Sequence, residues 1–277
     1  MADIVTVFLL PHVPLIASNP DAPPAEQKEK VMAAFKHVSD RLREERIDTV
    51  INIGSDHYCL FGPNCLPSAL IGIGDVEGPV EPWLGIPRAL LPTNPGLARH
   101  ILETGFDDGI DWASAKNMCV DHATMVPHHY CVRPVGEIST IPIYLNTAVD
   151  PVIPSKRAYA IGKSIGHAVR SWQGSERVAV LGTGGISHWV GMAQMGHINI
   201  DFDREIIRLA GKGDVDALIA MDDGETLSAA GNGALEIKNY ICAMATFPKS
   251  RAELIAYEPV HEWITGCGFM EFFRDAA

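Results

Sequence analysis

The sequence predicts an α/β protein, with a single domain in which a central, largely parallel or mixed sheet is flanked by helices. Short apolar segments rich in β-branched residues alternate with longer segments whose apolar residues recur at helical spacing. This alternation is typical of α/β folds. The 277 residues also contain no linker that would divide them, so we expect one domain over residues 1–277.

The first elements have clear boundaries. Residues 4–10 predict a strand, and Pro11 and Pro14 end it because proline cannot continue a central hydrogen-bonded ladder. After a loop over residues 17–24, residues 25–46 carry apolar side chains on one face and predict a helix. Residues 49–53 predict a second buried strand, which ends in the turn Gly54-Ser55-Asp56-His57.

The remaining elements continue the alternation. Strands are predicted over residues 69–73, 138–145 and 177–181, and helices over residues 96–104 and 156–172. Residues 78–95 are rich in proline and are expected to be irregular. The pattern is mostly helical from residue 201 to about residue 248, and residues 253–257 are expected to form a last strand.

Composition argues against several classes of function. The net charge is −12, with 34 acidic against 22 basic residues and no basic stripe, so we do not expect nucleic-acid binding. No apolar run reaches the roughly 20 residues of a membrane span, and no basic residues precede residues 4–10 as they would in a signal peptide. The six cysteines form no Cys-x-x-Cys pair, which indicates free thiols and favours the cytoplasm.

Several histidines follow predicted strands. His12, His57 and His188 each come after a strand and its turn, and His122 lies in a dense polar cluster. Ligands of open α/β sheets bind outside the carboxyl ends of the strands, so the first three are expected at one rim if the sheet is parallel there. One such histidine alone is more often structural, but three at equivalent positions favour a functional site.

Common catalytic motifs are missing. The chain lacks the His-x-x-Glu-His and His-Glu-x-x-His signatures of the zinc peptidases. It also lacks the Gly-x-Ser-x-Gly elbow of the serine hydrolases. Gly162-Lys163-Ser164 matches the last three positions of the phosphate-binding loop motif. However, Arg157 stands where that motif needs its first glycine, so we do not expect such a loop. The histidines therefore remain the strongest indication of a site.

Five short blocks, in order along the chain, resemble a known family. They are Pro11-His12, then Asp56-His57, then Val120-Asp121-His122 with Val126-Pro127, then Gly182-Thr183-Gly184-Gly185-Ile186-Ser187-His188, and finally Gly231-Asn232-Gly233-Ala234-Leu235-Glu236. Together they resemble the class III extradiol ring-cleavage dioxygenases, in particular the catalytic subunits of protocatechuate 4,5-dioxygenases. The resemblance covers most of the chain and implies an α/β fold with a central sheet.

The resemblance also implies roles for individual residues. In the family, two histidines and a glutamate hold a non-haem iron, and these roles fall on His12, His57 and Glu236. The acid–base histidine of the family falls on His188, and its second active-site histidine falls on His122. The implied cofactor is Fe(II), and the implied substrates are a small aromatic diol and dioxygen.

Other residues are expected to affect the choice of aromatic substrate. Ser55 stands where the protocatechuate enzymes carry an asparagine, and the pair His128-His129 is not part of the family pattern. With Ser187 of the glycine-rich block, these residues are expected to line the substrate pocket. The ring stays open among protocatechuate, gallate, O-methylgallate, aminophenol and simple alkylcatechols.

Two other functions and two kinds of partner also stay open. A zinc hydrolase uses the same types of ligand, and a non-catalytic metal-binding protein can share the fold. His188 and His122 favour an enzyme, because a metal store needs no acid–base pair. A homodimer is expected since two-fold dimers are the commonest soluble oligomers, and a small lid-forming subunit of the kind found in some relatives is a further candidate partner.

Overall fold

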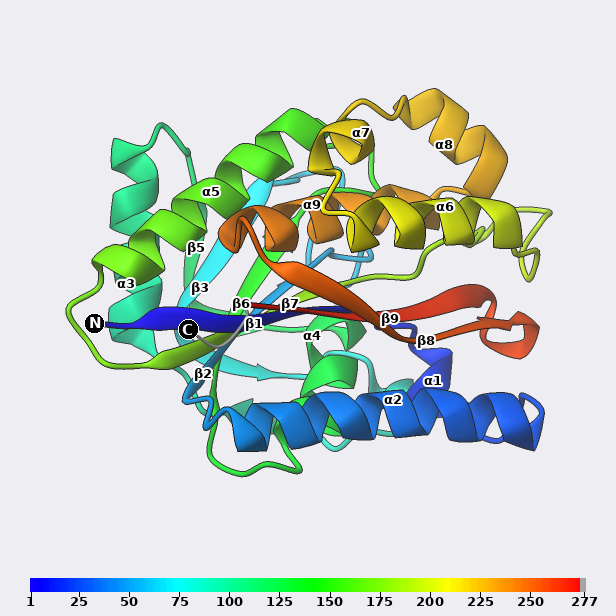
Figure 1. The fold of residues 1–277 in the computed structure, drawn as a ribbon, viewed down its shortest axis with the longest axis horizontal. Coiled ribbons are helices and arrows are strands. Elements are labelled where there is room, and N and C mark those ends of the chain that lie inside the picture. Colours follow the sequence, from blue (N-terminus) through cyan, green and yellow to red (C-terminus); the bar gives the residue numbers. More distant parts are fainter. Residues whose placement is uncertain (275–277) are drawn as a thin grey trace.

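A nine-stranded sheet runs through the computed structural model, which describes residues 1–274 (Figure 1). The strands are β1 (Asp3–Leu10), β2 (Thr49–Gly54), β3 (Ala69–Gly78), β4 (Ala89–Leu91), β5 (Ala113–Cys119), β6 (Ser139–Leu145), β7 (Arg177–Thr183), β8 (Arg251–Val260) and β9 (Thr265–Phe273). Their order is β4-β3-β6-β2-β7-β1-β9-β8, and β5 pairs with β3.

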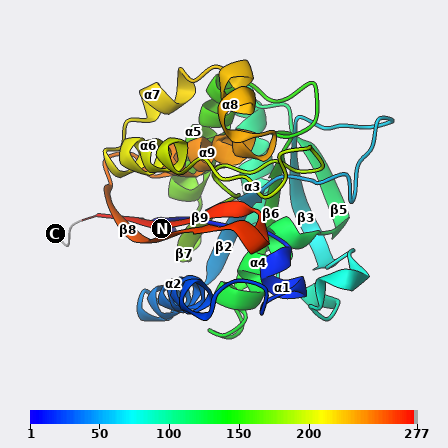
Figure 2. The same ribbon diagram turned by 90° about the vertical axis from the view of Figure 1, so that its right-hand side faces the viewer.

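Helices cover both faces of this sheet. They are α1 (Leu15–Ser18), α2 (Ala25–Glu44), α3 (Pro95–Asp107), α4 (His122–Pro127), α5 (Ser155–Ser171), α6 (Ile200–Gly211), α7 (Val215–Ile219), α8 (Asp223–Ala230) and α9 (Ile237–Thr246). Short helical turns are η1 (Pro82–Leu84), η3 (Gly233–Glu236) and η4 (His261–Trp263), and η2 (His128–Val132) is a π-helical turn. In both views α2 lies on one side of the sheet, and α5, α6 and α9 lie on the other (Figures 1 and 2).

The centre of the sheet is parallel and its margins are mixed. β1 pairs with β7, β7 with β2 and β2 with β6, all in parallel. β9 and β8 add antiparallel strands on one side, and β3 runs antiparallel to β6 on the other. The predicted α/β class with a mixed sheet is confirmed. The carboxyl ends of β1, β7 and β2 therefore lie side by side at one rim.

Two hydrophobic cores sandwich the sheet, because alternate side chains of each strand point to opposite faces. Ile51 of β2 and Val180 of β7 belong to the core under α3, α5 and α9, whereas Val50 and Leu181 belong to the core under α2 and α4. Each fully buried aliphatic side chain contributes roughly 1.5–3 kcal/mol. The two cores thus hold the three central strand ends in fixed positions.

The predicted strands and helices recur with boundaries shifted by up to five residues, and two predictions are corrected. Residues 78–95, expected to be irregular, contain η1 and the short strand β4. Residues 253–257 lie inside β8, but β8 is not the last strand, because β9 follows it and pairs with β1. β9 is buried along almost its whole length, so it lacks the alternation of polar and apolar residues that marks a half-exposed strand. Among residues 1–274 we find no helix long and apolar enough to cross a membrane.

Candidate metal centre and active site

Two histidines from neighbouring strand ends face each other. His12 follows β1 and His57 follows β2, and β7 lies between these strands in the sheet. Because all three strands run parallel, both histidines reach the same rim, with their ring centroids 5.0 Å apart and the rings nearly perpendicular. Segments far apart in sequence thereby supply one pair of imidazoles.

Glu236 joins this pair through one carboxylate oxygen. Oε1 of Glu236 lies 2.9 Å from Nε2 of His12 and 3.0 Å from Nε2 of His57. The other oxygen, Oε2, accepts a hydrogen bond of 2.9 Å from the backbone N–H of Gly185. Glu236 ends the 3-10 turn η3 and precedes α9, so it stands at a helix start and not within a regular helix as the sequence suggested.

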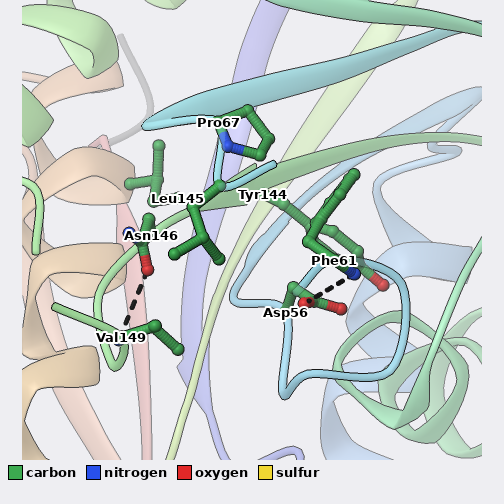
Figure 3. A pocket seen from close by; sticks show the side chains of 8 residues that line it. Asp56, Phe61, Pro67, Tyr144, Leu145, Asn146 and Val149 are labelled. Carbon is green, nitrogen blue, oxygen red and sulfur yellow. Dashed lines mark hydrogen bonds between the residues drawn. The ribbon is translucent and has the colours of Figure 1, made fainter. Parts of the chain in front are cut away.

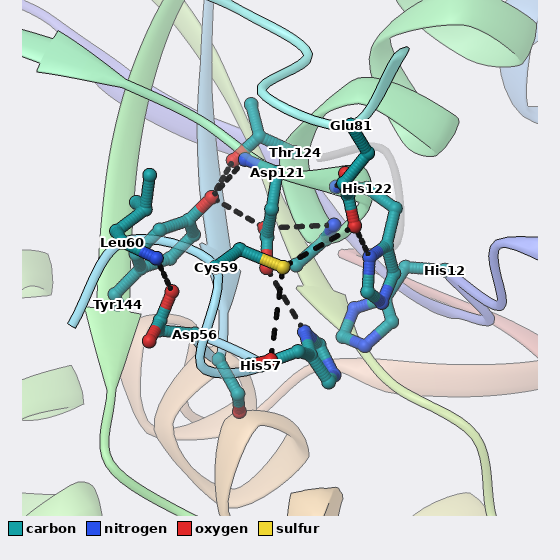
Figure 4. A network of polar contacts seen from close by, with 12 residues as sticks. His12, Asp56, His57, Cys59, Leu60, Glu81, Asp121, His122, Thr124 and Tyr144 are labelled. Atoms are coloured by element: carbon teal, nitrogen blue, oxygen red, sulfur yellow. Dashed lines mark hydrogen bonds and ion pairs between the residues drawn. The ribbon is translucent and has the colours of Figure 1, made fainter. Parts of the chain in front are cut away.

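The far nitrogens of both imidazoles are held by acceptors. Nδ1 of His12 lies 2.8 Å from Oγ1 of Thr183, whose hydroxyl donates to the carbonyl of Ile53. Nδ1 of His57 lies 3.0 Å from Oδ2 of Asp121 (Figure 4). With hydrogen on each Nδ1, both Nε2 atoms face Glu236 and can present a lone pair to a metal ion, as outer hydrogen bonds commonly arrange for metal-binding histidines.

Asp121 is itself fixed from several sides. Its Oδ1 accepts hydrogen bonds from the Tyr144 hydroxyl at 2.7 Å and from the backbone N–H of Ala123 at 3.0 Å (Figure 4). Sequence reasoning gave no role to Thr183, Asp121 or Tyr144. Thr183 and Asp121 do lie inside the quoted blocks, but their function as hydrogen-bond partners depends on contacts between distant segments.

The three central groups perturb one another's pKa values. Burial alone would raise the pKa of Glu236, but the facing imidazoles hold it well below its ordinary value. Burial alone would lower the pKa of His57, but the hydrogen bonds with Asp121 and Glu236 raise it well above. For His12, burial prevails and lowers the pKa. Such opposed shifts in one buried cluster are typical of functional sites.

The donor set of these residues fits a divalent metal ion. Two imidazole nitrogens lie within 3.0 Å of one carboxylate oxygen, and two histidines with one carboxylate form the facial triad of non-haem Fe(II) oxygenases. Zinc accepts the same donors. Ring nitrogens of His12, His57 and His122 also lie within 4.8 Å of one another, so His122 borders the same position.

His122 is bound to a carboxylate that sequence reasoning missed. It begins α4, and its ring centroid lies 4.1 Å from that of His57. Its Nδ1 lies 2.5 Å from Oε1 of Glu81, and its backbone N–H donates to Oε2 of Glu81 at 2.7 Å (Figure 4). Glu81 comes from the proline-rich segment that was expected to be irregular, where no motif marks it.

His188 lies on the other side of Glu236. Its Nε2 is 3.6 Å from Oε2 of Glu236, and burial lowers its pKa. The imidazole packs directly on Gly233, where an added Cβ would stand 2.0 Å from Nε2 of His188. The glycine of the Gly-Asn-Gly block is therefore required to make room for the histidine of the Ser-His block.

Backbone hydrogen bonds join these two blocks. The N–H of His188 donates to the carbonyl of Ala230, and the N–H of Gly233 donates to the carbonyl of His188. The amide of Asn232 binds both the N–H and the carbonyl of Val190, at 2.8 and 3.0 Å. The loop that carries His188 is thus tied to the turn that carries Glu236.

Ser55 and Ser187 are buried beside the site and are engaged in internal hydrogen bonds. Oγ of Ser55 lies 2.6 Å from Oγ1 of Thr147 and accepts a hydrogen bond from Asn239. Oγ of Ser187 accepts a hydrogen bond from the backbone N–H of Asn199. Both serines support the strand ends that carry His57 and His188.

His128 and His129 lie apart from the cluster, which corrects the expectation that they line its pocket. They form the π-helical turn η2, and Nδ1 of His128 lies 3.4 Å from Oγ1 of Thr140, near the amino end of β6. The His12–His57 rim is at the opposite, carboxyl end of the parallel strands. Both histidines instead line a separate surface pocket of ≈ 300 Å³ with Leu90 and Arg133.

A second small pocket adjoins the Asp56-His57 turn. Asp56, Phe61, Pro67, Tyr144, Leu145, Asn146 and Val149 are among the residues that line it (Figure 3). Its volume of ≈ 10 Å³ is about that of one water position, so an aromatic ring does not fit there.

Comparison with known proteins gives concordant matches. Residues 6–269 match the family described as the catalytic LigB subunit of aromatic ring-opening dioxygenase. Proteins named 2,3-dihydroxyphenylpropionate/2,3-dihydroxicinnamic acid 1,2-dioxygenase are similar to the chain. The one from Photorhabdus laumondii is 23% identical over an alignment of 308 residues that covers 95% of each chain. The one from a Rhodococcus species is 25% identical, with 95% and 96% covered.

A solved structure supports the fold alone. The crystal structure of an uncharacterized protein from Escherichia coli K12 superposes with a TM-score of 0.59 at 10% sequence identity. The superposition covers 96% of this chain and 99% of that protein. The sheet and its helices are therefore an arrangement already known from experiment.

Proposed function

Because the chain belongs to the family of catalytic LigB subunits of aromatic ring-opening dioxygenases, we propose that it is an Fe(II)-dependent extradiol dioxygenase acting on a catechol. One observation carries the choice of metal site. The Nε2 atoms of His12 and His57 converge on a single oxygen of Glu236, at 2.9 and 3.0 Å. This donor set leaves the other coordination positions of a bound ion for substrate and oxygen.

In this proposal, His12, His57 and Glu236 hold the iron. When bound, Fe(II) supplies adjacent open positions where a catechol and dioxygen can meet and exchange electrons. Thr183 and Asp121 keep the two imidazoles in the tautomer that presents Nε2. The low pKa of Glu236 keeps its carboxylate ionised and ready to bind a cation.

His188 is the proposed acid–base group. Burial lowers its pKa, so the imidazole is neutral at pH 7 and Nε2 can accept a proton from a catechol hydroxyl. The same nitrogen can return that proton to an oxygen of the opened ring. The distance of 3.6 Å between its Nε2 and Oε2 of Glu236 supports a role next to the proposed ion.

The relatives suggest the substrate class. The two compared dioxygenases are named for 2,3-dihydroxyphenylpropionate and 2,3-dihydroxycinnamic acid, which are catechols with a three-carbon acid side chain. We therefore place a catechol with a short carboxylated side chain first among the candidate substrates. A cytoplasmic location fits the free cysteines, and the homodimer and the small second subunit stay predictions that light scattering can test.

The test is oxygen uptake by protein loaded anaerobically with Fe(II). The panel contains 2,3-dihydroxyphenylpropionate, protocatechuate and 3-methylcatechol, and the matched control is the Zn(II)-loaded protein. We expect one dioxygen consumed per ring, with a yellow, pH-dependent product, and fastest turnover of 2,3-dihydroxyphenylpropionate. Folded, fully iron-loaded protein that takes up no oxygen with any catechol would contradict the function, and hydrolysis of an added ester or amide by the zinc form would favour the hydrolase instead.

A further inference from the structure

The pairing of His122 with Glu81 arises from two neighbouring parallel strands. β3 ends at Gly78 and β5 at Cys119, and these strands pair in parallel. Beyond their ends, the backbone N–H of Val80 donates to the carbonyl of Val120. This bond places Glu81 beside the first residue of α4, so the backbone fixes where the Glu81 carboxylate lies.

Both oxygens of Glu81 are engaged by His122. Oε2 accepts the backbone N–H of His122 at 2.7 Å, and Oε1 lies 2.5 Å from Nδ1 of the imidazole. Glu81 is 5% exposed and His122 is also 5% exposed, so little water competes for these bonds. An ionised carboxylate only accepts hydrogen bonds, so the hydrogen of the imidazole must be on Nδ1.

The imidazole of His122 borders the proposed metal position, with a ring nitrogen within 4.8 Å of ring nitrogens of His12 and His57. The imidazole lies beside those of His57 and His12, with centroid distances of 4.1 and 5.6 Å. With Nδ1 committed to Glu81, Nε2 is the nitrogen left for this pair, and in the neutral imidazole it carries a lone pair. Such a nitrogen can accept a proton or a hydrogen bond but cannot donate one.

We propose that Glu81 is a positioning residue of the active site, which fixes the tautomer of His122 and aims its Nε2 lone pair at the His12–His57–Glu236 triad. The inference rests on the proposed function, and it adds a residue that none of the five sequence blocks contains. A purely structural role would require only a hydrogen bond to the N–H of α4. The bidentate contact with both the backbone and the side chain of His122 goes beyond that role.

An alternative use of the same residues is a second cation site. Cys59, Glu81, Asp121 and His122 offer ligand atoms within 4.8 Å of one another. However, both oxygens of Glu81 already accept hydrogen bonds from His122, and Oε1 also accepts from the Cys59 thiol at 3.4 Å. Asp121 is likewise engaged by His57 and Tyr144. The contacts therefore favour an internal hydrogen-bond network.

Glu81→Gln tests the proposal because it changes the donor pattern and hardly changes the shape. The backbone N–H of His122 needs an acceptor, so the amide oxygen of the substituted side chain takes the place of Oε2. The amide NH₂ then faces Nδ1 of His122. Because an NH₂ group only donates hydrogen bonds, Nδ1 has to accept one and can no longer carry a hydrogen. The tautomer should thereby reverse, leaving a hydrogen on Nε2 where wild type has a lone pair.

The first readout is independent of activity. In diamagnetic, Zn(II)-loaded protein with ¹⁵N-labelled histidines, His122 is assigned by comparison with His122→Gln. We expect its Nδ1 to be protonated in wild type and its Nε2 to be protonated in Glu81→Gln. Glu77→Gln is the matched control, since Glu77 pairs with Arg88 at the exposed margin, and it should keep the wild-type spectrum.

The second readout is turnover of the Fe(II) form. Glu81→Gln should lower kcat for oxygen uptake by about 10–100-fold, with iron content and KM near wild type. Glu81→Asp keeps a carboxylate, so it should keep the wild-type tautomer and recover part of kcat. An unchanged tautomer, an unchanged kcat or a loss of iron in Glu81→Gln would overturn the proposal. If wild type consumes no oxygen, the proposed function fails, while the tautomer result still decides the role of Glu81.

Discussion

The most specific prediction concerns one methyl group, added by Gly233→Ala. A Cβ at this position would stand 2.0 Å from Nε2, 2.2 Å from Cδ2 and 2.3 Å from Cε1 of His188. Ordinary contact begins near 3.4 Å, so the imidazole has to move by about 1.4 Å. A misplacement of roughly 1 Å can cost about 100-fold in rate, so we expect kcat to fall by at least about 100-fold.

The same substitution should leave the metal in place. His12 and His57 are not among the atoms that a Cβ at Gly233 would meet first, and Oε2 of Glu236 stays anchored by the N–H of Gly185. Overpacking a filled site costs roughly 1–3 kcal/mol, which a folded domain of this size tolerates. The variant should therefore bind iron at the wild-type ratio while turnover collapses.

The assay compares iron content, oxygen uptake and urea unfolding for wild type, Gly233→Ala and the control Gly211→Ala. Gly211 ends α6, where an added Cβ would meet Met270 at an ordinary 3.6 Å, so this control should behave like wild type. Wild-type kcat in Gly233→Ala would refute the role of His188 or its packing on Gly233. A parallel loss of iron and activity would instead show that the turn of Glu236 had been disrupted.

Three further predictions address the rest of the site and the stability of the fold. Thr183→Val removes the partner of His12 Nδ1 without changing size, so metal affinity, measured by competition with a chelator, should fall about 10–100-fold; unchanged affinity would contradict it. Glu236→Ala should abolish iron binding and turnover together, whereas His188→Ala should keep the iron and lose about 100- to 10,000-fold in kcat; normal turnover of the His188 variant would rule out its acid–base role. Burial lowers the pKa of His128 to about 4, below its ordinary value, so its contribution to stability is full above pH ~6.5 and is lost as pH falls toward 4. Between pH 7 and pH 5 the metal-free protein should lose about 2 kcal/mol from this group, and urea unfolding of His128→Gln should show a correspondingly smaller loss.

The sequence predicted the strands at the centre of the sheet because they are short, β-branched and closed by proline or glycine. Residues 4–10, 49–53 and 177–181 all fall within observed strands. The sequence did not predict β9 or β5. β9 is buried on nearly every side, and β5 carries polar side chains such as Lys116 and Asn117 on a marginal strand. In both cases neighbouring strands, and not local pattern, determine the structure.

The central triad was also accessible from the sequence, whereas its supporting residues were not. His12 and His57 follow strands, and the Glu236 block matched a family pattern. Glu81, Thr183, Asp121 and Tyr144 matter through hydrogen bonds between separate segments, such as the bond between Tyr144 and Asp121, which are 23 residues apart. His128 and His129 are the opposite case. Sequence reasoning expected this conspicuous pair at the site, but it lies near the amino end of β6, away from the site.

The contacts explain why five separated blocks are needed to build one site. Each block supplies a side chain of the proposed site or holds the side chain of another block. The strand end before the glycine-rich loop binds His12 through Thr183, and the loop itself binds Glu236 through Gly185. The Asp121 block binds His57, and the Gly233 turn accommodates His188. Removing one partner leaves another buried polar group unpaired, so substitutions in different blocks should combine non-additively although they lie far apart in sequence.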